Sequence, residues 1–178
     1  MSPIILEYGP FQIRWYGVLV ALSFLSGIII TYYYGRRYNI KAEILDRIMI
    51  RIVLAMIVGA RLGYVVANYS FFLDNPHLIP RVDMGGLGSH GGIITCLILG
   101  IWWSKRLKFS FWSVCDAVAP VIPLAHIFVR LGNFINAELY GPPTELPWGV
   151  VFRGEIVPHH PSQLYEAGVS LIILPLVF

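Results

Sequence analysis

Long apolar runs separated by short polar segments dominate the chain. A helix that crosses a hydrocarbon core about 30 Å thick needs roughly 20 predominantly apolar residues. The first run, residues 15–34, meets this length and has aromatic side chains at both ends, as expected at a membrane interface. Four more runs follow, so the pattern predicts spans at about 15–34, 48–69, 91–103, 114–130 and 165–178.

Two of these runs have special features. Pro120 and Pro123 fall inside the fourth run, so we expect that helix to be kinked. The fifth run reaches the last residue without a closing polar flank. We therefore expect a chain that is incomplete at its C-terminus, with about five spans present.

Composition supports a membrane protein. Only 13% of the residues are charged, whereas a soluble domain has about 25%. The mean hydropathy is +0.69. The net charge of +3 is not gathered in a basic block, so we expect no nucleic-acid partner. The two cysteines, Cys96 and Cys115, show neither metal spacing nor a disulfide framework. The predicted class is an all-α, polytopic helical membrane protein, with residues 1–178 forming a single integral membrane domain in the lipid bilayer.

Basic residues predict the orientation of the helices. They concentrate in the loops after the first and third runs, at Arg36, Arg37, Lys41, Arg47, Lys105, Arg106 and Lys108. The alternate loops contain only Arg81 and Arg153. By the positive-inside rule the N-terminus lies outside, and the loops 70–90 and 131–164 lie at the outer face.

Arg61 is the most deeply placed charge of the second run. It lies too far along the helix to reach the cytoplasmic surface, so it should face protein, water or an anion. Gly59 and Gly63 flank it in a spacing that lets a neighbouring helix approach closely. Two interpretations remain open: Arg61 binds an anionic ligand, or it pairs with a carboxylate and locks two helices together.

The fourth run contains the densest polar series. His126, Arg130 and Asn133 are separated by four and three residues, so they share one helical face. The planar guanidinium of Arg130 suits phosphate. The series continues with Asn136, Glu138 and Gly141. The alternative is an ordinary polar helix end, which is less favourable in a membrane because unpaired polar groups are costly there.

Two further motifs border apolar runs. His90 lies in GGLGSHGG, residues 85–92, where glycines permit close approach of a ligand and the imidazole suits a general base. The alternative is a structural histidine. In HHPSQLYE, residues 159–166, Gln163 and Glu166 share a helical face. The alternative there is helix capping and packing.

Five motifs occur in the order found in prolipoprotein diacylglyceryl transferases, and the chain resembles this family over almost its whole length. The motifs are RWYG at 14–17, GARLGYV at 59–65, GGLGSHGG at 85–92, RLGNFINAELYG at 130–141 and HPSQLYE at 160–166. The chain has Thr95, Val129 and Ala137 where the family often has glycine. Family members continue through two more spans, which contain another essential arginine, so the resemblance implies about five spans of an expected seven.

The resemblance implies a reaction at the outer face of the bacterial inner membrane. The diacylglyceryl group of phosphatidylglycerol passes to the lipobox cysteine of a prolipoprotein, which forms a thioether and releases glycerol phosphate. No cofactor or metal is implied. The functional positions of the family carry over to Tyr16, His90, Arg130, Asn133, Glu138 and Gly141.

We combine these positions with the candidates identified from the residues. The expected catalytic residues are His90, Arg130 and Tyr16. Phosphatidylglycerol is expected to contact Arg130, Arg61, Asn133, Glu138, Gly141, Gly91 and Gly92. Supporting roles are expected for Asn136, His126, Gln163 and Glu166.

Two other functional classes remain open from the sequence. An inactive truncated relative that binds anionic lipid is compatible with the missing spans. A transporter is compatible with intramembrane Arg61 and Arg130 beside helix-kinking prolines. A transporter predicts paired broken spans in an internal repeat, and the sequence shows no such repeat.

Overall fold

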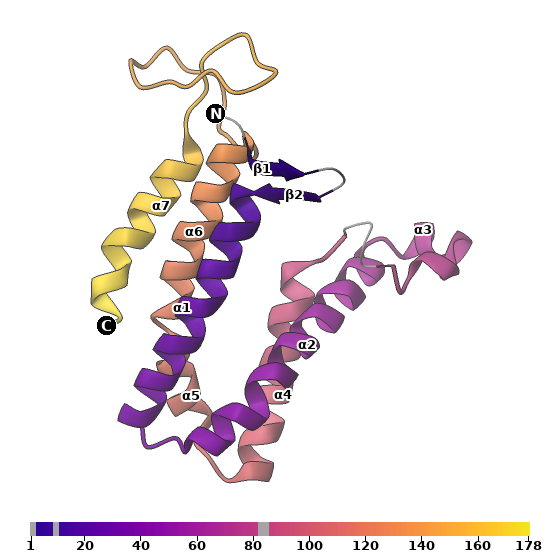
Figure 1. Cartoon of the computed structure of the whole chain (residues 1–178). Coiled ribbons are helices and arrows are strands. Elements are labelled where there is room, and N and C mark those ends of the chain that lie inside the picture. The colour runs from indigo at the N-terminus through magenta and orange to yellow at the C-terminus, as the bar shows by residue number, and fades with distance from the viewer. Residues whose placement is uncertain (1–2, 9–10, 82–85) are drawn as a thin grey trace. The chain divides into compact units, whose positions relative to one another are not determined.

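The computed structural model describes residues 3–8, 11–81 and 86–178, and most of these are helical. The helices are α1 (Trp15–Arg37), α2 (Ala42–Ala67), α3 (Tyr69–Asp74), α4 (Ser89–Leu107), α5 (Phe111–Val118), α6 (Val121–Asn136) and α7 (Ser162–Ile173) (Figure 1). Short 3-10 turns cover Pro76–Leu78 and Leu174–Leu176. The strands β1 (Ile4–Tyr8) and β2 (Phe11–Arg14) form an antiparallel hairpin, which the apolar pattern does not predict.

The lengths and compositions of the helices confirm the polytopic helical membrane class. Among the described residues, three helical segments are long and apolar enough to cross a membrane: Trp15–Arg37, Ala42–Ala67 and Phe111–Asn136. A shorter apolar helical segment covers Ser162–Leu176. Large apolar side chains on α1, α2 and α4 are exposed, such as Ile29, Val58 and Ile98. Acyl chains are a more suitable environment than water for such surfaces.

The proline-rich part of the fourth apolar run is broken, as predicted. Helix α5 ends at Val118, and α6 begins at Val121 after a turn at Ala119 and Pro120. Pro120 is almost completely buried. Proline lacks an N–H group and clashes with the preceding helical turn, which explains the interruption.

The described chain divides into two compact units. One unit joins the residues up to 34 with residues 115–178, and the other covers residues 35–114. Each unit is described by itself below. The first contains most of α1 and all of α6 and α7, and the second contains α2, α3 and α4.

Glycines allow α2 and α4 to pack closely in the second unit. A Cβ atom added at Gly59 would lie 2.2 Å from the Thr95 Oγ1 atom and 2.8 Å from the carbonyl oxygen of Gly91. A Cβ atom at Gly63 would lie 2.8 Å from the Cα atom of Gly91. The close helix approach predicted from the Gly59–Gly63 spacing is therefore confirmed, and the neighbouring helix is α4.

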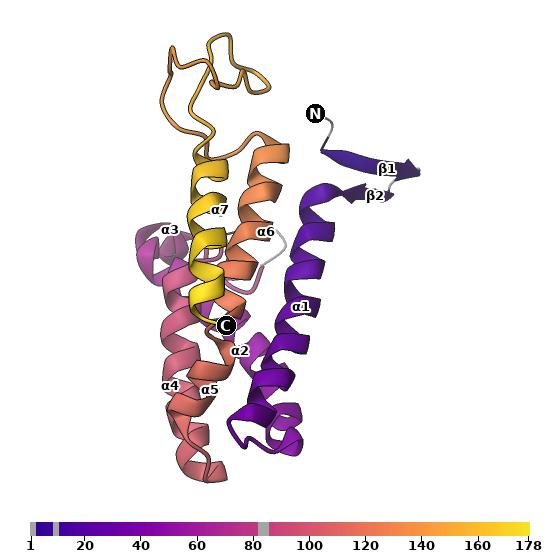
Figure 2. The same ribbon diagram turned by 90° about the vertical axis from the view of Figure 1, so that its left-hand side faces the viewer.

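In the first unit, α6 and α7 lie side by side and run in opposite directions (Figures 1 and 2). The long connection between them, residues 137–161, folds back at the end of the pair where α6 finishes and α7 begins. His159 forms bridges with Pro143 and Val150, which hold this loop together. The polar residues at this end of the two helices are therefore brought into one region.

Candidate functional site

Arg130 joins α6 to α7. Its Nη2 atom lies 2.5 Å from the Oε2 atom of Glu166, and its side chain is 19% exposed. Arg130 projects from α6 toward α7 because it shares the helical face of His126 and Asn133. A charge-assisted contact between groups of opposite sign is stronger than a neutral hydrogen bond, so the pair fixes the guanidinium against α7.

His126 lies one helical turn before Arg130 and accepts a hydrogen bond from it. The Arg130 Nε atom lies 3.2 Å from the His126 Nε2 atom. Arginine has only donors, so this ring nitrogen must be the acceptor and the ring proton resides on Nδ1. The Nδ1 atom lies 2.8 Å from the Oγ atom of Ser170 on α7 and donates to it. Ser170, which no sequence motif indicated, is buried.

A second polar group surrounds Glu138 at the end of α6. Its carboxylate accepts hydrogen bonds from Asn133 Nδ2 at 3.4 Å and from Asn136 Nδ2 at 3.3 Å. Gln163 is fully buried at the start of α7, and its Nε2 atom donates to the backbone oxygen of Glu138 at 2.6 Å. Ala137 adopts a left-handed conformation with φ of 60°, which ends α6 and turns the chain toward this position.

The amide oxygens around Glu138 have no hydrogen-bond donor within the described residues. They are Asn133 Oδ1, Asn136 Oδ1 and Gln163 Oε1, and all are buried. Buried polar atoms are normally hydrogen-bonded to protein or water. This group therefore offers acceptors to a molecule that brings hydroxyl or N–H donors.

Gly141 lies where the loop returns to α7. Its backbone N–H donates to the carbonyl oxygen of His160 at 2.9 Å, and its own carbonyl accepts from His159 Nδ1 at 2.8 Å. A Cβ atom here would lie 2.4 Å from the Ser162 Oγ atom and 2.9 Å from the His160 Cβ atom. The absence of a side chain at Gly141 thus has a packing reason.

Three loop side chains form a further polar group, whose mutual contact the sequence did not indicate. The Tyr140 hydroxyl donates to the Glu155 carboxylate, whose Oε2 atom lies 3.4 Å from His159 Nε2. The Tyr140 ring also stacks on Phe152, with centroids 4.6 Å apart. The hydrogen bond to Glu155 raises the pKa of Tyr140, and partial desolvation and the negative charge of Glu155 raise it further.

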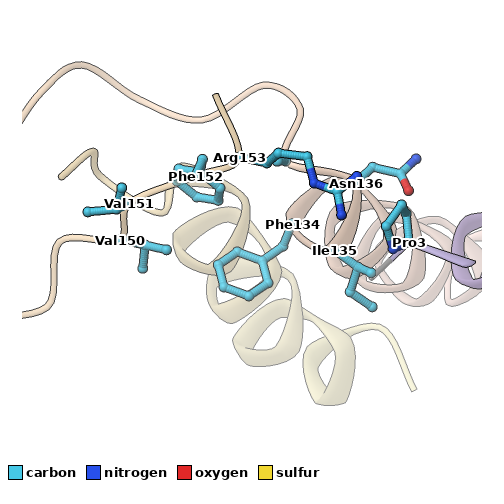
Figure 3. A pocket seen from close by; sticks show the side chains of 9 residues that line it. Pro3, Phe134, Ile135, Asn136, Val150, Val151, Phe152 and Arg153 are labelled. Atoms are coloured by element: carbon cyan, nitrogen blue, oxygen red, sulfur yellow. The ribbon is translucent and has the colours of Figure 1, made fainter. Parts of the chain in front are cut away.

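A small cavity lies beside this loop, with a volume of about 140 Å³. Figure 3 shows its lining, with Arg153 and Asn136 at the same end as Pro3 and with Phe134 and Val150 along the rest. Asn136 is the only candidate named from the sequence that lines it among the described residues. The cavity is thus centred on the loop and the end of α6 rather than on Arg130.

Tyr16 lies in the first turn of α1, within the same unit. A Cβ atom at Gly132 of α6 would lie 2.7 Å from the Tyr16 Cδ2 atom, so the ring packs on α6 at this glycine. Gly132 lies between Arg130 and Asn133 in sequence. Tyr16 therefore packs on α6 beside the turn that contains Arg130, and its expected catalytic role stays a prediction.

Arg61 is buried in the second unit, where it donates to backbone carbonyl oxygens of described residues. The partners of Nε, Nη2 and Nη1 are Ile79 at 2.8 Å, Leu78 at 2.6 Å and Gly86 at 3.0 Å, respectively. These contacts tie the segment after α3 to α2. They favour a structural role for Arg61, and the pairing with a carboxylate stays a prediction. Its contact with phosphatidylglycerol stays a prediction.

His90 is exposed in the first turn of α4. Gly88 before it donates to the carbonyl oxygen of Ala60 at 2.8 Å, which attaches the start of α4 to α2. The sequence assigned Gly91 and Gly92 to a ligand, but added Cβ atoms there would meet α2, at Gly59 and Met56. Their role in lipid binding stays a prediction, while Gly85 lies outside the described residues.

The first unit thus brings together most of the residues expected at the site: Tyr16, His126, Arg130, Asn133, Asn136, Glu138, Gly141, Gln163 and Glu166. Arg61, His90, Gly91 and Gly92 belong to the second unit. In the part of the chain that the structure describes, no three His, Cys, Asp or Glu side chains form a group suited to a metal ion.

Long apolar helices with an arginine–carboxylate pair at a helix interface define a polytopic helical membrane protein. A family model for prolipoprotein diacylglyceryl transferase matches residues 3–178. The similar protein of Bordetella parapertussis is 38% identical, over 98% of this chain and 69% of its own length. That of Nitratidesulfovibrio vulgaris is 38% identical, over 98% and 68%. That of Photobacterium profundum is 36% identical, over 100% and 70%.

All three relatives are named phosphatidylglycerol–prolipoprotein diacylglyceryl transferase. The chain belongs to the prolipoprotein diacylglyceryl transferase family. The resemblance inferred from the five sequence motifs is therefore confirmed.

Proposed function

We propose that this protein transfers the diacylglyceryl group of phosphatidylglycerol to the cysteine thiol of a prolipoprotein lipobox, at the outer face of the bacterial inner membrane. The observation that carries the proposal is the family match over residues 3–178. The transfer forms a carbon–sulfur bond, breaks the bond between the glycerol carbon and the phosphate oxygen, and releases glycerol phosphate.

The arrangement around Arg130 supports binding of an anionic headgroup. The guanidinium is held between two helices and has further N–H groups beyond those that contact His126 and Glu166. Negative charge develops on the phosphate as its bond to the glycerol carbon breaks. A fixed arginine stabilises such charge because it needs little reorganisation during the reaction.

The polar group around Glu138 supports recognition of an uncharged, hydroxyl-bearing part of the lipid. The Asn133 and Gln163 side chains are buried and present amide oxygens without a donor from the described residues. Hydroxyl groups of a glycerol headgroup are suitable donors. In this proposal Asn133, Glu138 and Gln163 orient the headgroup while Arg130 binds its phosphate.

The thiol of the prolipoprotein must lose its proton, because the thiolate is the reactive nucleophile. We assign this role to His90, whose imidazole is exposed at the start of α4. The proton moves from sulfur to the imidazole, and the thiolate attacks the glycerol carbon bonded to phosphate. The departing glycerol phosphate takes the electron pair of the broken bond.

The experiment is transfer in proteoliposomes that contain the chain and phosphatidylglycerol with a labelled headgroup. A lipobox peptide should gain the mass of a diacylglyceryl group while labelled glycerol phosphate is released in equal amount. A peptide with serine in place of cysteine and vesicles of phosphatidylcholine are the controls. Absence of both products with the cysteine peptide would overturn the proposal.

A further inference from the structure

The neighbours of Arg130 occupy one defined edge of its guanidinium group. Nε contacts His126 at 3.2 Å, and Nη2 contacts Glu166 at 2.5 Å. The N–H bond of Nε and one N–H bond of Nη2 point to the same side of the planar group, as one fork. The His126 Nε2 and Glu166 Oε2 atoms are themselves 3.6 Å apart, so both acceptors lie at this fork.

The opposite fork consists of Nη1 and the second N–H bond of Nη2. Within the described residues, no hydrogen bond or ion pair of Nη1 is found. Two parallel N–H groups match two oxygens of a phosphate. The direction of this fork depends on the fork that His126 and Glu166 hold, because the guanidinium is rigid and planar.

Ser170 determines the orientation of the His126 ring. The ring proton on Nδ1 is donated to Ser170 Oγ at 2.8 Å, which turns Nε2 toward Arg130. Ser170 is 6% exposed and lies on α7 in the turn after Glu166. Hydrogen bonds therefore run in one direction, from Arg130 to His126 and from His126 to Ser170.

We propose that His126 and Ser170 are positioning residues, which hold the Arg130 guanidinium so that its outer fork binds the phosphate of the lipid substrate in a bidentate manner. This inference rests on the proposed function, and it adds two residues that act through Arg130. Neither residue needs to contact the substrate. Glu166 supplies the ionic partner, and the His126–Ser170 pair fixes the rotation of the guanidinium plane.

Four variants of the full chain test this inference in proteoliposomes: His126→Leu, His126→Gln, Ser170→Ala and the control Val169→Ala. Leucine removes the acceptor for Arg130, whereas the glutamine oxygen can replace Nε2. Val169 is adjacent to Ser170 on α7 and is exposed. Thermal unfolding of each variant shows which ones fold. Ser170→Ala removes the hydrogen-bond acceptor of His126 and so disturbs the same network without changing the histidine.

His126→Leu should lower kcat/KM for phosphatidylglycerol about 10- to 100-fold, because a misplacement of about 1 Å can cost this much. His126→Gln should recover most of the loss, and Val169→Ala should match the wild type. Because both changes break one network, the double variant His126→Leu, Ser170→Ala should match His126→Leu within about twofold. A purely structural role of the imidazole would give neither the recovery nor the non-additivity.

Wild-type kcat/KM in His126→Leu, or no recovery in His126→Gln, would overturn the positioning role while leaving the proposed function intact. Absence of transfer by the wild-type chain would overturn the proposed function instead. The variants are then compared for binding of phosphatidylglycerol in detergent micelles. Weaker binding by His126→Leu and recovery by His126→Gln would support positioning, and equal affinities would overturn it.

Discussion

The Nη2 atom of Arg130 on α6 lies 2.5 Å from the Oε2 atom of Glu166 on α7. The two residues are far apart in sequence and lie in two different motifs, RLGNFINAELYG and HPSQLYE. This ion pair links the two motifs directly. The packing of α6 against α7 and the orientation of the Arg130 side chain therefore depend on the same contact.

Glu166→Gln should weaken both features. Glutamine retains an oxygen acceptor but loses the charge, so the contact with Arg130 becomes a weaker hydrogen bond. We expect the free energy of unfolding to fall by about 1–2 kcal/mol, since the glutamate side chain is 43% exposed and solvent already screens the pair. Unfolding in detergent measures this effect. Glu145→Gln, an exposed position in the loop, is the control, and equal stability of the two variants would contradict the prediction.

Gly59→Ala should separate α2 from α4. The added methyl group would lie 2.2 Å from Thr95 Oγ1 and 2.8 Å from the backbone oxygen of Gly91, and backbone cannot move aside easily. We expect a loss of about 1–3 kcal/mol, as for other overpacked positions. Gly168→Ala in α7 is the matched control, because nothing lies within 4 Å of its added Cβ atom and alanine favours a helix. A Gly59→Ala protein as stable as wild type would show that the helices are farther apart.

Arg61→Lys separates the two interpretations that the sequence leaves open. An ammonium group cannot reproduce a planar fork that reaches Leu78, Ile79 and Gly86 together. If Arg61 is structural, stability should fall by about 1–3 kcal/mol, because half-buried carbonyl groups lose their donors. Limited proteolysis should then cleave the segment after α3 faster. Arg36→Lys at an exposed position is the control. Unchanged stability together with weaker phosphatidylglycerol binding would favour the ligand role.

Tyr140→Phe should change how stability depends on alkaline pH. The pKa of Tyr140 is raised in the folded chain, chiefly because its hydroxyl donates to Glu155. Its contribution to stability is therefore fully present below the ordinary tyrosine pKa near 10 and is lost as pH rises through the higher folded-state pKa. Unfolding measured between about pH 8 and pH 11 should decline less steeply for Tyr140→Phe than for the wild type. Parallel declines would show that the hydrogen bond has no such effect.

His90→Gln tests the assignment of the general base. Glutamine approximates the size of histidine but cannot accept the thiol proton at neutral pH, so the rate of glycerol phosphate release should fall about 10²- to 10⁴-fold. Phosphatidylglycerol affinity should change little, because the proposed headgroup contacts lie on α6, on α7 and at Glu138 just after α6. His77→Gln, on the 3-10 turn after α3, is the control. Full activity in the His90 variant would remove the base from the mechanism.

Apolar runs were sufficient to predict the helical membrane class, but not the helix ends. Helix α2 begins at Ala42, before the apolar run, because Glu43 and Arg47 are good helix formers that extend it beyond its apolar part. Tyr69, which the apolar pattern assigned to the same span, instead begins the separate helix α3. Hydropathy indicates which residues suit a lipid environment. Helix ends depend instead on the helix propensity and backbone hydrogen bonding of the residues at each end, which hydropathy does not report.

Periodicity predicted which residues of α6 share a face, and the structure places Arg130 and His126 in contact on it. It could not identify Ser170, because that contact joins residues 44 positions apart through helix packing. A serine inside an apolar run also has no distinctive pattern. Periodicity could not identify the Tyr140–Glu155 contact either, because the course of a long loop is not periodic.

The contact between Gly59 and Gly91 has a consequence for the residue that precedes Gly91. No side chain separates the two backbones there. The position of the His90 backbone along α2 is therefore determined by contact between the two main chains. Substitutions on the exposed faces of α2 and α4 should therefore leave the His90 backbone in place. A single methyl group at the glycine contact would displace it.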